Sequence, residues 1–179
     1  MKRARAIYLA IIVISLSIIS ISLYYVLGGF DPVKIYFFDG TTRTVIGREY
    51  VLPDSNKYFQ RQMDSIKSDL SDGNLRGMLT AVVYQDEELQ DSIRYFIGAA
   101  QDSIKGVARV PAGFDYRQFR TQKIYKIFIT QSHWISPTPQ KMEELMLIKS
   151  IEEGEILKPY TFEIYYEDGS FSIEKWVKN

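Results

Sequence analysis

The sequence of 179 residues contains no cysteine and one histidine, His133. Without thiols the chain forms neither disulfides nor thiolate metal sites. Its carboxylates show no metal-ligand spacing, so neither a metal nor a cofactor is predicted. Lys and Arg together number 22, as do Asp and Glu. There is thus no basic excess of the kind that supports nucleic-acid binding, and no nucleic-acid partner is predicted.

Charged residues are also missing from one long segment near the start of the chain. Residues 6–30 carry no charged side chain, and the stretch AIYLAIIVISLSIISISLYYVL is almost wholly apolar. An α-helix rises about 1.5 Å per residue, so about 20 such residues cross the hydrocarbon core of a bilayer. The segment predicts a single membrane span over residues 6–27. This divides the chain into an amino-terminal anchor of residues 1–30 and one domain of residues 31–179.

A cleavable signal peptide and a buried core helix are the alternatives for this segment. A signal peptide has an apolar core of about 7–15 residues and a small-x-small cleavage site. Here the core is longer, and YVLGGFDP after it lacks such a site. Lys2, Arg3 and Arg5 precede the run, and basic residues tend to remain cytoplasmic. We predict a single-pass protein with a cytoplasmic amino terminus and an extracytoplasmic domain, the alternative being a cytosolic domain.

Turn signals and hydrophobic periodicity divide residues 31–179 into two similar halves. The predicted strands span residues 33–38, 44–52, 78–84, 93–100, 115–120, 124–130, 160–167 and 170–177. One helix is predicted after Pro53, and a second begins at 136–139 and ends near Gly154. The predicted apolar stripes are Phe59, Met63, Ile66 and Leu70 in the first helix and Met142, Leu145, Met146 and Ile148 in the second. Both halves are interpreted as strand, helix, strand, strand. The predicted fold class is α+β: a pseudo-duplicated β-α-β-β domain with a curved antiparallel sheet and two helices on one face.

Three segments, taken in order, resemble those of a known family. They are LRGMLTAVVYQDEEL at 75–89, VARVPAGFDYRQFRTQKIYKIFIT at 107–130 and FEIYYEDGSFSIEKWV at 162–177. The set resembles the GyrI-like small-molecule-binding family, which has an SHS2-type duplicated fold. The resemblance implies an effector-binding domain like those of bacterial regulatory factors. The layout of this chain, a predicted span followed by such a domain, resembles that of one branch, the animal testis-expressed ER-phagy receptor. The receptor role of that branch does not carry over to this chain.

The last predicted strand carries the residue of greatest interest, Glu174. It alternates with Ile173 and Lys175 and so shares a strand face with Trp176. The resemblance implies that this glutamate forms the floor of an aromatic pocket for cationic ligands. A carboxylate among aromatic faces is partly desolvated, so a lipophilic cation gains charge pairing and cation–π attraction. The alternative is that Glu174 faces water and has no role in ligand binding.

The predicted function is therefore binding of an amphipathic or cationic small molecule in an aromatic pocket with a carboxylate floor. The candidate ligand-binding residues are Glu174, Trp176, Tyr165, Glu163, Phe128 and Tyr84. For Glu163 a structural role is favoured, with a secondary role in the site.

Two other functions remain open. A hydrolase of strained-ring compounds would use the same pocket, as the resemblance also implies, with Glu174 as general base. A protein-interaction module would use the acidic run at 86–88. His133 and Trp134 invite an interpretation as a base beside an aromatic plate, but no motif pairs them with a nucleophile. We predict no catalytic residue, and the sequence identifies no protein partner.

Overall fold

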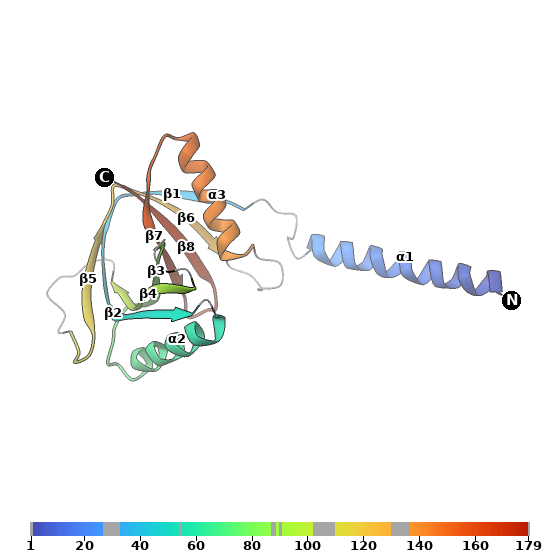
Figure 1. Cartoon of the computed structure of the whole chain (residues 1–179). Helices are drawn as coiled ribbons and strands as arrows, with labels where there is room; N and C mark the ends of the chain where they lie inside the picture. Colours follow the sequence, from blue (N-terminus) through green and yellow to red (C-terminus); the bar gives the residue numbers. More distant parts are fainter. Residues whose placement is uncertain are drawn as a thin grey trace. The chain divides into compact units, whose positions relative to one another are not determined.

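The computed structural model describes residues 2–26, 33–53, 55–86, 89, 91–101, 110–129 and 137–178. Its contacts divide the chain into two units, residues 1–33 with 131–137 and residues 34–130 with 138–179. The first unit contains helix α1 (Lys2–Val26), and the second contains the sheet (Figure 1).

In the second unit the described residues form an eight-stranded sheet in which every pairing is antiparallel. The elements of this unit follow the order β1 (Ile35–Asp39), β2 (Thr42–Pro53), α2 (Asn56–Ser71), β3 (Met78–Tyr84), β4 (Ser92–Gln101), β5 (Asp115–Arg120), β6 (Lys123–Ile129), α3 (Pro139–Glu152), β7 (Leu157–Tyr165) and β8 (Phe171–Val177). The predicted α+β class with an antiparallel sheet is confirmed.

The strand order shows how the two halves combine. Across the sheet it runs β1-β6-β8-β7-β3-β4-β2-β5. The first half of the domain contributes β1–β4 and the second half β5–β8. If β1 is exchanged with β5, β2 with β6, β3 with β7 and β4 with β8, the same order results, read from the other edge of the sheet. The first strand of each half pairs with the other half, β1 with β6 and β5 with β2. The predicted β-α-β-β unit is thus corrected to β-β-α-β-β, because each half has an extra strand before its helix.

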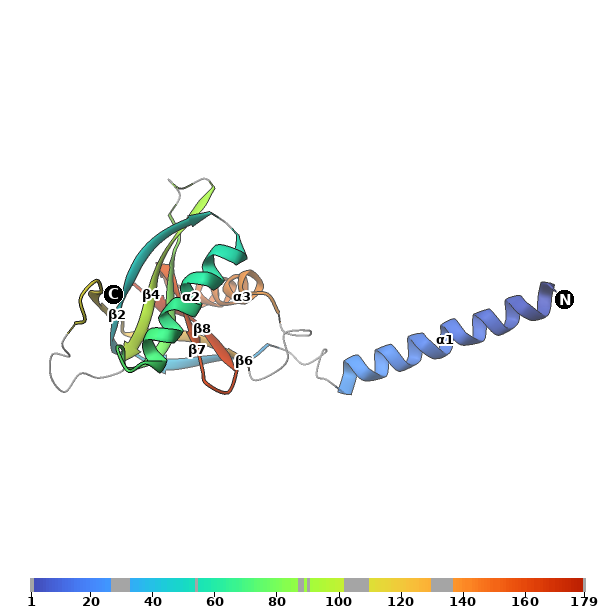
Figure 2. The same ribbon diagram turned by 90° about the horizontal axis from the view of Figure 1, so that it is seen from below.

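Both helices cover the same face of the sheet (Figure 2). Met63 and Ile66 of α2 are buried in one cluster with Ala81 of β3. Ala81 lies opposite Glu163 in the pairing of β3 with β7, so these two side chains project to one face. Thr161 shares that face with Glu163. The hydroxyl of Thr161 donates to the carboxylate of Glu143, on α3, at 2.8 Å. The prediction of two helices on one face is confirmed.

The opposite face of the sheet, which we call the helix-free face, carries a second core. The buried residues of this core come from the seven strands β2–β8, and they are Val45, Val82, Phe96, Ala100, Phe119, Ile124, Phe162 and Trp176. Because side chains alternate between the two faces of a strand, residues two apart on one of these strands project to the same face. Four of the eight buried residues of this core are aromatic, whereas the buried residues of the cluster beneath α2 are aliphatic or methionine.

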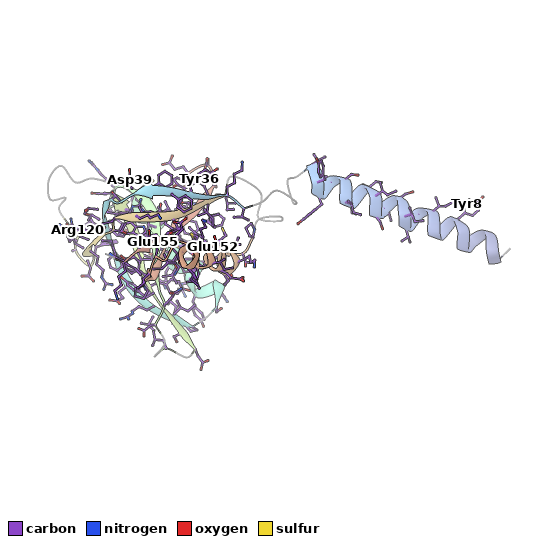
Figure 3. All side chains as sticks on the ribbon, turned by 90° about the horizontal axis from the view of Figure 1, so that it is seen from above. Tyr8, Tyr36, Asp39, Arg120, Glu152 and Glu155 are labelled. Carbon is purple, nitrogen blue, oxygen red and sulfur yellow. The ribbon has the colours of Figure 1, made fainter. Side chains whose placement is uncertain are left out.

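Helix α1 forms where the apolar run predicted a helix. Its described side chains, including that of Tyr8, are exposed (Figure 3). The hydroxyl of Ser17 donates to the carbonyl of Val13 at 2.9 Å, so this serine satisfies its polar group within the helix. In the described part of the chain, no helix has both the length and the apolar character needed to cross a membrane. The predicted anchor is therefore not supported, and the predicted membrane topology stays a prediction.

Candidate functional site

Aromatic rings gather at the centre of the helix-free face. Phe162 of β7 and Trp176 of β8 stack with their ring centroids 4.5 Å apart and an interplanar angle of 26°. Phe119 of β5 meets Phe162 edge to face at 5.0 Å, and Tyr160 lies 5.4 Å from Phe119. Offset and edge-to-face arrangements of this kind are favoured by the quadrupoles of the rings. The cluster is therefore a packed aromatic wall built from β5, β7 and β8.

Glu174 lies beside this wall and is buried, with 1% of its surface exposed. Its Oε2 accepts hydrogen bonds from Nη1 of Arg43 at 2.6 Å and from Nε1 of Trp176 at 3.1 Å. Its Oε1 lies 3.1 Å from Nζ of Lys126. A buried carboxylate is tolerated only when it is paired and hydrogen-bonded, and both oxygens of Glu174 meet this condition.

Arg43, near the start of β2, is one of several residues of this site that the sequence did not predict. It is 6% exposed, and its guanidinium carbon lies 5.5 Å from the ring centroids of both Phe162 and Trp176. Such distances are typical of cation–π contacts. Glu174 and Trp176, which were predicted to receive a cationic ligand, thus hold a cation of the chain itself, together with Phe162. Arg43 and Glu174 are 131 residues apart, so no local pattern indicates their pairing.

Lys126 of β6 is the second cation of this cluster. Its Nζ lies 3.0 Å from the hydroxyl of Tyr166, besides its ion pair with Glu174. Burial by itself lowers the pKa of Lys126, but the charge of Glu174 and the hydrogen bond to Tyr166 outweigh burial and raise it. Lys126 therefore stays protonated at neutral pH, and one buried carboxylate faces two cations.

A second charged group lies on the same face, around Tyr84. Nη1 of Arg117 donates to the Tyr84 hydroxyl at 2.9 Å, and Nη2 of Arg117 donates to Glu49. The ring of Tyr84 meets that of Tyr160 edge to face at 6.2 Å, and Tyr160 lies 6.5 Å from Trp176. Burial raises the pKa of Tyr160 to about 12. An aromatic path thus joins Tyr84 to the rings beside Glu174.

The other predicted site residues are placed differently. Phe128 lies on the helix-free face, where it packs edge to face on Tyr166 at 5.3 Å and stays 38% exposed. Glu163 and Tyr165 lie on the helix-bearing face, where the Tyr165 hydroxyl donates to Glu163 at 2.7 Å. The structure therefore brings Glu174 and Trp176 together, links them to Tyr84 through Tyr160, and separates them from Glu163 and Tyr165.

The hairpin register contains the signal that would have made this distinction. Phe162 lies directly opposite Glu174 in the pairing of β7 with β8, whereas Glu163 lies opposite Ile173. Opposed residues of an antiparallel pair project to the same face. Counting back from the turn at Asp168-Gly169 thus points to Phe162, rather than Glu163, as the neighbour of Glu174.

Other features of the described residues offer less for the predicted site. A hollow of about 250 Å³ is lined by the loop after α2, including Leu75 and Arg76, and by Ile46 and Pro111, but by none of the predicted site residues. The described part of the chain holds no group of three or more acidic or histidine side chains placed to bind a metal ion. His133 and Trp134 lie outside the described residues.

No family model matches the chain, and no curated protein matches it. Solved structures do match. SAV2435 bound to tetraphenylphosphonium is 16% identical, with a TM-score of 0.51 over 83% of this chain and 94% of that chain. EcmrR in a complex with DNA is 12% identical, with a TM-score of 0.53 over 99% and 70%. The C-terminal domain of EcmrR is 11% identical, with a TM-score of 0.50 over 83% and 98%.

These likenesses define the fold. The sheet domain of this chain has the same fold as SAV2435 and the C-terminal domain of EcmrR. At identities of 11–16% the likeness concerns the fold alone. The membrane-anchored branch of the family receives no support from it.

Proposed function

We propose that the chain is a small-molecule-binding protein whose ligand is an amphipathic aromatic compound that binds on the helix-free face beside Glu174. The observation that carries this proposal is the aromatic path from Trp176 through Tyr160 to Tyr84, with charged groups at both ends. Binding sites for small molecules combine apolar and aromatic walls with a few placed polar groups. SAV2435, which has the same fold, binds a cation of four phenyl rings.

The ring surfaces would supply most of the affinity in this proposal. Tyr84 and Tyr160 are partly buried and pack against the core of the helix-free face, so each has a side that a ligand ring can cover. Phe128 offers a further exposed ring on the same face. The polar groups of the ligand would meet Arg117 or the Tyr84 hydroxyl at one end. At the other end they would meet the Glu174 cluster, which consists of Glu174, Arg43 and Lys126.

A thermal-shift screen tests this function. The full chain is screened against uncharged and amphipathic aromatic compounds, because a ligand that binds only the folded state raises the melting temperature with its concentration. Dissociation constants of the hits are then measured for two variants, Tyr84→Leu on the helix-free face and Tyr116→Leu on the exposed side of β5. We expect several-fold weaker binding in Tyr84→Leu, the usual worth of an aromatic pair, and native affinity in Tyr116→Leu. Absence of any hit, or equal losses in the two variants, would contradict the proposal.

A further inference from the structure

Both carboxylate oxygens of Glu174 are already paired with cations of the chain, so neither is left for an added cation. Oε2 of Glu174 already accepts from Arg43 and from Trp176, and Oε1 pairs with Lys126. The guanidinium of Arg43 also lies over Phe162 and Trp176, the two rings nearest the carboxylate. A lipophilic cation would need both this carboxylate and these ring faces.

We infer that Arg43 is the specificity-determining residue of this site: it acts as a resident cation that closes Glu174 to cationic ligands, so that the native chain selects uncharged or anionic aromatic compounds. The inference rests on the proposed binding function and adds the charge of the ligand. It also departs from the cationic ligand that the resemblance implies for Glu174, and keeps the amphipathic ligand that was predicted beside it.

Displacing Arg43 is costly because its interactions are buried. The side chain of Arg43 is 7% exposed and that of Glu174 is 2% exposed, so the pair is shielded from water and salt. Breaking a buried ion pair leaves a charge without its partner, and the penalty corresponds to a factor of about 10² or more in an equilibrium constant. An external cation would have to overcome this factor before it gained any affinity.

Lys126 provides a matched comparison because it has the same charge and pairs with the same carboxylate. Its Nζ lies 5.7 and 6.0 Å from the ring centroids of Tyr166 and Phe38, and it has no such contact with Phe162 or Trp176. Removing Lys126 therefore leaves Arg43 in place over the rings. Removing Arg43 uncovers the rings while Lys126 still pairs with Glu174, which keeps the buried carboxylate from losing both of its cations.

The test uses tetraphenylphosphonium chloride as the probe, with titration calorimetry on the full chain. We expect weak or no binding to the native chain and to Lys126→Met. In Arg43→Met the affinity should rise by about 10²-fold. The double variant Arg43→Met/Glu174→Gln should lose that gain, since the carboxylate is no longer charged. Near-ultraviolet circular dichroism verifies that each variant is folded.

Three results would overturn the inference: a folded Arg43→Met variant without increased affinity, an equal gain in Lys126→Met, or a gain that survives Glu174→Gln. The native chain gives a second readout that needs no variant. The indole N–H of Trp176 reports on its hydrogen bond to Glu174 in a nuclear magnetic resonance spectrum. We expect this signal to stay in place when the probe is added, and a saturable shift would also overturn the inference. Failure of the uncharged panel on the native chain concerns the proposed function instead, so the two failures are distinguishable.

Discussion

The indole Nε1 of Trp176 donates a hydrogen bond of 3.1 Å to the carboxylate of Glu174, two residues earlier on β8. Residues two apart on a strand project to the same face, so the strand itself sets this geometry. Both side chains are buried, at 0% and 1% exposure. A single ring thus serves the aromatic wall through its stack on Phe162 and the buried carboxylate through its N–H group.

The substitution Trp176→Phe separates these two roles. It keeps an aromatic ring for the stack on Phe162 and removes the donor to Glu174. We expect the free energy of unfolding to fall by about 1.5–3 kcal/mol, the usual worth of a hydrogen bond to a charged group. Urea denaturation measures the change, and a double-mutant cycle with Glu174→Gln isolates the interaction between the two side chains. A coupling energy near zero would show that the hydrogen bond contributes nothing.

The starts of the two helices provide a prediction with an internal control. The side chain of Thr138, the N-cap of α3, accepts a hydrogen bond from the backbone N–H of Lys141 at 3.3 Å. Ser55 holds the same position in α2 but makes no such side-chain bond. We expect Thr138→Ala to cost about 1 kcal/mol, a fall of roughly 2–4 °C in melting temperature, and Ser55→Ala to cost much less. Calorimetric melting of both variants gives the comparison, and equal losses would contradict it.

Local sequence signals account for the features that were predicted correctly. The turn at Asp168-Gly169 closes the last hairpin, where Gly169 has a φ of 82° and Tyr166 N–H donates to the carbonyl of Ser170 at 2.9 Å. Glycine adopts this left-handed conformation at no steric cost, so the signal is specific. In α2 the predicted stripe buries Met63 and Ile66 against the sheet, because its helical spacing fits the observed helix.

The features that sequence analysis missed depend on partners far away in the chain. Strand β1 was predicted as a strand, but alternation does not say that it pairs with β6, some ninety residues later. The pairing of Arg43 with Glu174 has the same origin, since β2 and β8 lie in different halves of the sheet.

In α3 the predicted stripe included Ile148, which is 47% exposed. The buried positions Met142, Met146 and Ser150 instead follow steps of four residues.

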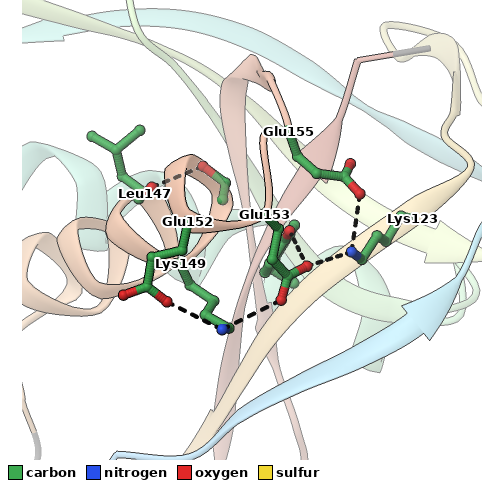
Figure 4. Close-up of polar contacts among 8 residues, drawn as sticks. Lys123, Leu147, Lys149, Glu152, Glu153 and Glu155 are labelled. Carbon is green, nitrogen blue, oxygen red and sulfur yellow. Dashed lines mark hydrogen bonds and ion pairs between the residues drawn. The ribbon is translucent and has the colours of Figure 1, made fainter.

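An ion-pair network at the end of α3 predicts a dependence of stability on acid pH (Figure 4). The ammonium of Lys123 lies 2.5 Å from Glu153, and the Tyr125 hydroxyl donates to the same carboxylate at 2.9 Å. Lys123 first, and then Tyr125, holds the pKa of Glu153 below its usual value. A carboxyl with a lowered folded-state pKa contributes stability above its unfolded-state pKa of about 4.3, and the contribution is lost as pH falls through the folded-state pKa.

The variants Glu153→Gln and Glu152→Gln test this network. Urea denaturation between pH 3 and pH 6 should show the native chain losing its advantage over Glu153→Gln as the pH falls. Glu152 is exposed, and among the described residues it pairs with Lys149 alone, so Glu152→Gln should follow the native pH profile. A constant difference between the native chain and Glu153→Gln at all pH values would refute the role given to Glu153.

Glu163 predicts the opposite pH dependence. Burial raises the pKa of its carboxyl and the charge of Glu143 adds to the rise, while the hydrogen bond from Tyr165 opposes it. Above about pH 4.3 the unfolded chain ionises this group first. The folded chain then loses stability with increasing pH until its own raised pKa is passed.

The substitution Glu163→Gln removes this titration and keeps an oxygen that can accept from the Tyr165 hydroxyl. The variant should gain stability relative to the native chain as pH rises from 4 to 8, with the difference measured by urea denaturation at each pH. Glu167→Gln, in the exposed turn before β8, is the matched control and should show no such trend. A difference that stays flat, or that favours the native chain at neutral pH, would mean that Glu163 is ionised at little cost in the folded state. In that case the domain would hold an ionised carboxylate on its helix-bearing face as well as on its helix-free face.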